Sequence, residues 1–295
     1  MSNPGFLTRL IAKSAAGLFG FTSGVVRNAR TFHPDGRTFL GAVRSLEPAD
    51  PSYARAAGRL QGATLMRIGM GVMKRGAPVW LAKIIPDAPS ISARIYTASS
   101  PQEIRIEHIP EEDLDLLCTA GGDRLSKLAF NLATGGRLFG LNPFDYFQNF
   151  YYADVPYSID EGKSNVWIRI APIPYPGQGK SKTPRDPEFR EQGLTSAVNE
   201  RKVMHIEFQP VGGNKAAFVP VAEIQFLKEI EVDQEALHFD PIAGRDFRPG
   251  GFYTALREKV YPASYRKRPH NRAQRASRQK EGILRRSIRY LSRKG

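Results

Sequence analysis

Seven short segments that alternate apolar with polar residues, or that concentrate β-branched residues, constrain the fold of this chain most. Each of them is typical of a β-strand. They are residues 37–44, 77–85, 91–97, 103–108, 164–171, 202–209 and 219–227. Because most of them are neighbours along the chain, they are expected to pair antiparallel. The pattern therefore predicts an antiparallel sheet that closes into a barrel.

Four other segments show helical periodicity, with apolar residues three or four positions apart. They are residues 51–76, 111–133, 143–152 and about 252–260. The 22 prolines and 27 glycines indicate many turns, which argues against a helical bundle. Together these signals predict the α+β fold class, with a closed antiparallel β-barrel and helices around it.

The composition is that of a soluble globular protein, with 41% hydrophobic and 24% charged residues. At 295 residues the chain is long enough to bury a full core. No run of about 18 apolar residues occurs, so a membrane-spanning helix is not expected, and we expect a cytoplasmic protein. Cys118 is the only cysteine, which excludes a disulfide within the chain and a cysteine-rich metal site.

Most of the formal net charge of +14 lies at the C-terminal end. Residues 256–295 hold 14 Lys or Arg against two acidic residues, so the rest of the chain is close to neutral. We therefore divide the chain into an N-terminal amphipathic arm (1–29), a folded domain (30–270) and a basic tail (271–295). The arm resembles a weak targeting peptide, but we expect it to stay attached. The tail is expected to be solvated, partly helical and able to contact anionic surfaces.

Two common kinds of catalytic pattern are missing from the sequence. No G-x-S-x-G occurs, which argues against the nucleophile elbow of a hydrolase. The histidines also lack a paired spacing suited to zinc. They are His33, His108, His205, His238 and His270.

The stretch REKVYPASYRKR, residues 257–268, places a tyrosine among several cations. If the residues before it are helical, Arg257 and Tyr261 lie on one helical face, because they are four positions apart. A nearby guanidinium stabilises the ionised form of a phenol, whose pKa is ordinarily about 10. One use of a phenolate in proteins is as the proximal ligand of ferric haem. The other interpretation is a half-buried tyrosine at the start of the basic tail.

A histidine stands shortly before the first predicted strand. It is His33, in the sequence RTFHPDG (residues 30–36). Taken alone, such a histidine is most often a surface or core residue. With Arg30 it forms the pattern R-x-x-H-x-x-G, and this pattern resembles the distal haem segment of the catalase family.

Three further segments resemble that family in the same order along the chain. Residues 257–268 fit its proximal pattern, R-x-x-x-Y-P-x-[ST]-x-R-x-R. Residues 147–173 are similar to a stretch that leads into one of its strands, and residues 236–251 to its approach to the proximal helix. On these four matches together, the chain resembles a catalase-like haem protein without the C-terminal domain of the large catalases.

The resemblance implies haem b (iron protoporphyrin IX) as the cofactor. Tyr261 would be the proximal ligand of the iron, and Arg257 would hold it as the phenolate. His33 would be the distal base, which takes a proton from the peroxide and returns it to the leaving oxygen. Arg30, Arg257 or Arg268 would meet the haem propionates, and the choice among them stays open.

The chain departs from the family at the distal asparagine. In the comparable place the sequence RIEHIPEED (105–113) has Glu107 and His108 before Pro110. We therefore expect a haem peroxidase or weak catalase, with a peroxide as substrate and a small molecule as electron donor. Two alternatives stay open: a haem enzyme that rearranges lipid hydroperoxides, and a non-catalytic basic binding protein that retains the barrel. Assembly into a homo-oligomer is also left open.

Overall fold

The computed structural model describes the strands and helices between residues 36 and 249. The described residues are 36–70, 89–96, 106, 113–121, 142, 144–153, 156–159, 164–176, 186–212, 216–232, 237, 239–240 and 247–249. The strands are β1 (Gly36–Ser45), β2 (Gly62–Met70), β3 (Pro89–Tyr96), β4 (Asp113–Gly121), β5 (Phe150–Ala153), β6 (Tyr157–Ile159), β7 (Ser164–Pro172), β8 (Val203–Pro210), β9 (Val219–Ile230) and β10 (Arg248–Pro249). The helices are the 3-10 turns η2 (Pro51–Tyr53) and η4 (Tyr146–Gln148), the single turn α2 (Ala54–Ala57) and α5 (Pro187–Asn199).

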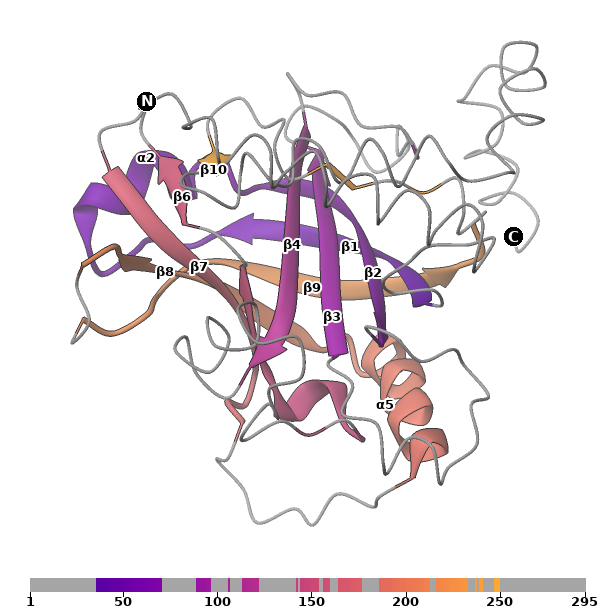
Figure 1. Ribbon diagram of the computed structural model, residues 1–295. Helices are drawn as coiled ribbons and strands as arrows, with labels where there is room; N and C mark the ends of the chain where they lie inside the picture. The colour runs from indigo at the N-terminus through magenta and orange to yellow at the C-terminus, as the bar shows by residue number, and fades with distance from the viewer. Residues whose placement is uncertain are drawn as a thin grey trace, which may run out of the picture.

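Eight of these strands form a closed antiparallel barrel (Figure 1). Their order is β7-β5-β4-β3-β2-β1-β9-β8, and β8 pairs again with β7, which closes the sheet on itself. β6 pairs with the first residues of β7, and β10 pairs with β6, so these two short strands extend the sheet beside the barrel. Closure leaves the eight barrel strands without a free edge. The predicted fold class is confirmed.

The inside of the barrel is apolar. One hydrophobic cluster takes side chains from all eight barrel strands, and only the barrel interior is shared by all of them. Because successive side chains of a strand point to opposite faces, the residues between the interior ones face outward. The interior residues of the first four strands include Phe39, Val43, Met66, Ile68, Ile91, Ala93, Ile95, Leu114, Leu116, Cys118 and Ala120.

Three helical segments add side chains to this interior cluster: η4 adds Tyr146, and the other two, near α2 and in α5, lie well apart in Figure 1. α5 begins at Asp186, whose carboxylate accepts a hydrogen bond from the backbone N–H of Glu188 at 2.9 Å, and Leu194 is buried in the cluster. Near α2, the ring of Tyr53 meets Phe208 edge-on at 5.5 Å. Both segments therefore pack onto the barrel and help to close its interior. No helix within the described ranges is long and apolar enough to span a membrane.

Five of the seven predicted strands are confirmed, as β1, β3, β7, β8 and β9. Of the other two, residues 77–85 lie outside the described residues, and only Ile106 is described in 103–108. The amphipathic arm, the basic tail and the predicted helix at 252–260 also lie outside them. α5 had no counterpart among the predicted helices.

Three of the predicted helices are wrong over most of their described residues. The segment 51–76 is helical only to Ala57 and then forms β2, 111–133 contains β4, and 143–152 holds one 3-10 turn before β5. β2 pairs with β1 on one side and β3 on the other, and its described side chains after Gly62 are all buried. A strand that is buried on both faces does not show the alternation that marks a half-exposed strand, so its apolar run is compatible with a helix.

Candidate functional site

The site residues that the sequence predicts lie outside the described residues. This applies to Arg30, His33, Glu107, His108, Arg257, Tyr261 and Arg268. The structure instead describes the parts of the chain next to them in sequence. β1 begins at Gly36, shortly after His33, and Ile106 directly precedes Glu107. These neighbours all lead to one region of the barrel, the outer face of β1–β4.

The outer face of β1–β4 is buried and polar. The outward side chains of these four strands lie next to one another because of the strand pairing, and we call this set of side chains the polar outer face. An outward-facing side chain of a barrel strand is normally exposed to solvent. Burial here therefore means that other parts of the chain cover this face. Its buried polar members are Thr38 on β1, Arg67 on β2, Ser90, Ser92 and Arg94 on β3, and Asp113 and Asp115 on β4.

Arg67 lies in the half of this face that is next to the start of β1, the strand that follows His33. The strand pairing sets it between Thr38 and Ser92, and it is only 2% exposed. Its guanidinium lies against Gly36, where an added Cβ would stand 2.8 Å from the Arg67 Cζ. Gly36 is itself paired with Gly69, so the surface beside the guanidinium has no side chain on either of these two strands. The guanidinium therefore occupies the space above Gly36, and its planar set of donors is of the kind that suits a carboxylate.

The other half of the polar outer face is organised by a buried ion pair. Arg94 donates from Nε and Nη2 to the two carboxylate oxygens of Asp115, at 2.8 and 2.7 Å, and both side chains are 0% exposed. Burial acts to lower the pKa of Arg94, but the charge and hydrogen bonds of Asp115 outweigh it, so the pKa is raised above its ordinary value. Arg94 is therefore charged at neutral pH.

Two other segments attach to this ion pair. Arg94 also donates from Nη1 to the carbonyl of Ile106, and the backbone N–H of Asp240 donates to Asp115 Oδ2 at 2.6 Å. The Arg94 guanidinium lies 5.3 Å from the ring centre of Phe239, which belongs to a second hydrophobic cluster with Leu65 and Tyr96. This half of the face is thus covered by the chain that follows β9.

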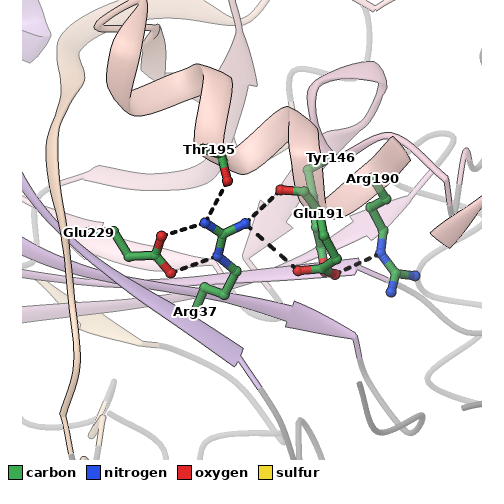
Figure 2. A network of polar contacts seen from close by, with 6 residues as sticks. All are labelled: Arg37, Tyr146, Arg190, Glu191, Thr195 and Glu229. Atoms are coloured by element: carbon green, nitrogen blue, oxygen red, sulfur yellow. Dashed lines mark hydrogen bonds and ion pairs between the residues drawn. The ribbon is translucent and has the colours of Figure 1, made fainter. Parts of the chain in front are cut away.

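On the inner side, the start of β1 is held at one end of the barrel by Arg37 (Figure 2). Its guanidinium binds the Glu229 carboxylate through two nitrogens, one of them Nε at 2.7 Å. It also donates to the carbonyl of Glu191 at 2.6 Å and to the Thr195 hydroxyl at 2.9 Å, both on α5. The hydrogen bond with Glu229 raises the pKa of Arg37 above its ordinary value. The strand that follows His33 is therefore fixed to both β9 and α5.

A third charged cluster lies across the barrel, on β7 and β8. The Arg169 guanidinium lies 4.2 Å from the ring centre of Phe150 and 4.1 Å from that of Phe218, and its Nε donates to Glu207 at 2.6 Å. The Tyr175 hydroxyl donates to the same carboxylate at 2.6 Å. Burial, and then the bond to Glu207, raise the pKa of Tyr175 to about 12. Every charged group of this cluster is used in contacts with its neighbours.

The sequence reasoning missed Arg67, Arg94 and Asp115. A signal was present, since Arg67 and Arg94 are each the single charge of a largely apolar strand, in LMRIGM (65–70) and ISARIY (91–96), and Asp115 is one of two charges in DLDLLC (113–118). Among the described residues no three His, Cys, Asp or Glu side chains gather as a metal site would require. The described chemistry of this region is therefore that of buried charged side chains on the outer face of the barrel.

No protein-family model and no curated protein matches this sequence. Solved structures do match its fold. Catalase A from Saccharomyces cerevisiae superposes with a TM-score of 0.53 at 13% identity over 82% of this chain and 61% of its own. A bacterial catalase gives 0.54 at 12% identity, over 91% and 62%, and a fungal catalase gives 0.53 at 11% identity, over 82% and 59%. The fold is catalase-like, and the chain spans about three fifths of the length of these catalases.

Proposed function

We propose that this chain binds haem b at the polar outer face and acts on peroxides, as a peroxidase or weak catalase. The observation that carries the proposal is the buried guanidinium of Arg67, which stands beside the paired Gly36 and Gly69 on a covered face of a catalase-like barrel. The four sequence segments that resemble the catalase family add support, because two of them flank this face along the chain.

The described residues fit a haem in shape and charge. Haem is a flat, largely apolar ring with two propionate carboxylates. Gly36 allows the Arg67 guanidinium to lie close against the strand, and this guanidinium provides a planar set of donors for a carboxylate. Leu65 and Leu40, paired next along the same face, provide apolar contact. We add Arg67 to Arg30, Arg257 and Arg268 as a candidate partner of the propionates.

In the proposed mechanism the protein supplies a ligand, a base and a dry setting. Tyr261 would hold the haem iron as the phenolate, which Arg257 would stabilise through its charge. His33 would take a proton from the peroxide and return it to the oxygen that leaves when the O–O bond breaks. When bound, the haem supplies the redox chemistry of peroxide reduction. The burial of the face excludes water, which strengthens each of these polar interactions.

Haem binding is tested by Tyr261→Phe, which removes the proposed ligand oxygen. Protein expressed with added haem should show a Soret band, and the variant should lose most of its haem while its circular dichroism spectrum is retained. The matched control is Tyr265→Phe, four residues further on, which should keep its haem. Equal haem content in the two variants would refute Tyr261 as the ligand.

Catalysis is tested by His33→Ala on haem-loaded protein. The variant should keep its haem but react with hydrogen peroxide about 10²-fold more slowly, the usual effect of losing a positioned base. A stopped-flow rate equal to that of the wild type would exclude His33 as the base. Oxygen release, donor oxidation and products from a fatty-acid hydroperoxide, measured on the same wild-type sample, distinguish catalase, peroxidase and rearrangement activity.

A further inference from the structure

One buried ion pair joins two parts of the chain that are far apart in sequence. The described contacts of Arg94 and Asp115 extend beyond each other to the carbonyl of Ile106 and to the backbone N–H of Asp240. Ile106 directly precedes Glu107 and His108, the residues that stand where the catalase family has its distal amide. Asp240 lies in the 236–251 segment, which resembles the family's approach to the proximal tyrosine.

Stability alone does not account for this pair. Removing two charges from water is costly, and replacing a buried ion pair by apolar residues of similar volume is often neutral or stabilising. Arg94 and Asp115 could join β3 to β4 without further contacts, because the strands are already paired at these two residues. A further donor of Arg94, on Nη1, and a second bond to Asp115 Oδ2 are instead used on the two covering segments. The geometry is that of a clamp.

We propose that Arg94 and Asp115 are a positioning pair for the haem site. They hold two stretches of backbone against one fixed point of the barrel. One is residue 106, on the distal side of the site, and the other is residues 239–240, on the proximal side. This inference rests on the proposed haem function. Neither residue touches the cofactor in this scheme. The pair sets how tightly and in which geometry the haem is held, because it fixes the spacing of two segments that lead toward the distal and proximal sides of the site.

The Arg169–Glu207 pair provides a matched control. It is also a charged pair between neighbouring strands, its carboxylate is 0% exposed, and its guanidinium also lies against aromatic rings. It lies on β7 and β8, and its described partners are the nearby Tyr175 and aromatic side chains. It is not bonded to Ile106 or to residues 239–240 in the described structure.

The experiment compares the double variants R94M/D115L and R169M/E207L with the wild type. Apolar replacement of both partners avoids an unpaired buried charge, so both variants should fold. Without haem, hydrogen exchange should be at least about 10-fold faster in R94M/D115L for peptides that contain Ile106 or residues 237–240. With haem, that variant should release it to apomyoglobin at least about 10-fold faster and show an altered ferric spectrum. R169M/E207L should match the wild type in each of these measurements.

The outcomes separate this inference from the proposed function. A wild type that takes up no haem refutes both. A wild type that binds haem, with unchanged haem release and spectrum in R94M/D115L, overturns the positioning role alone. Unchanged hydrogen exchange in that variant overturns the clamp itself. If R94M/D115L does not fold, Arg94→Lys takes its place, because it keeps the charge but cannot reach Asp115 and Ile106 together with a single ammonium group.

Discussion

Replacing Arg37 by methionine should loosen the barrel end shown in Figure 2. The Arg37 side chain is 7% exposed and is bonded to Glu229, the Glu191 carbonyl and the Thr195 hydroxyl. Methionine keeps an aliphatic stem of similar length but removes every donor. The carbonyl and hydroxyl on α5 then lose a charged partner, whereas Glu229, at 40% exposed, can return to water.

The expected loss follows from these contacts. Each hydrogen bond between a charged group and a partly buried partner contributes about 1.5 kcal/mol, so the two bonds to α5 give roughly 3 kcal/mol. The pair with the half-exposed Glu229 adds about 1 kcal/mol at most, because water screens it. Some of this loss is recovered when water enters the loosened end. We expect the free energy of unfolding to fall by about 2–4 kcal/mol.

The assay is equilibrium unfolding in urea, and β1 offers its own control. Arg44 on the same strand also pairs with a glutamate of β9, Glu223, but it is 73% exposed. Arg44→Met should therefore cost no more than about 1 kcal/mol. A double-mutant cycle of Arg37→Met with Thr195→Val should show a coupling energy of about 1 kcal/mol. If Arg37→Met costs no more than Arg44→Met, the barrel end is not held in this way.

Three further predictions use four substitutions. Gly36→Ala places a methyl group 2.8 Å from the Arg67 Cζ, and the guanidinium must shift to make room for it. The free energy of unfolding should change little, whereas haem affinity should fall about 10-fold in a haem titration. An unchanged affinity would show that Arg67 is not part of the haem site. Gly41→Ala puts its Cβ 2.6 Å from a backbone carbonyl of β9, so the free energy of unfolding measured in urea should fall by about 1–3 kcal/mol. Gly193→Ala in α5, whose Cβ would have nothing within 4 Å, should be neutral or stabilising. Equal effects of the two substitutions would contradict the close packing at Gly41. Because the pKa of Tyr175 is raised to about 12, its proton stabilises the folded state below pH 10 or so, and that contribution is lost as the pH rises toward 12. Stability should therefore fall less between pH 9 and 11.5 in Tyr175→Phe than in the wild type, and an equal fall would contradict the bond to its carboxylate partner.

The sequence predicted the barrel because most of its strands keep one face wetter than the other. In β7, for example, Val166, Ile168 and Ile170 are buried and the residues between them are more exposed, so alternation is visible. β2 lacks that contrast, because a second layer covers its outer face as well. A local pattern reports only how each side chain alternates, and whether the outward side is covered depends on segments far away in the chain.

The same limit applies to the site. Short motifs pointed to Tyr261 and His33, since a resemblance can be read from consecutive letters. Arg94 and Asp115 are 21 residues apart, and only the register of β3 against β4 makes them opposite neighbours. The sequence places a charge in each strand, but the pairing that gives these charges a role is a property of the closed sheet.

The polar outer face also determines which barrel can form at all. A strand that slips by one residue turns its outward side chains inward. In β3 such a slip would direct the Arg94 guanidinium into the apolar interior and leave Asp115 on β4 buried without its partner. An uncompensated buried charge costs about 3–5 kcal/mol, a large share of the stability of an ordinary domain. The charges of the polar outer face therefore favour the correct register of the strands. A barrel with a shifted register is disfavoured even where its backbone hydrogen bonds are complete.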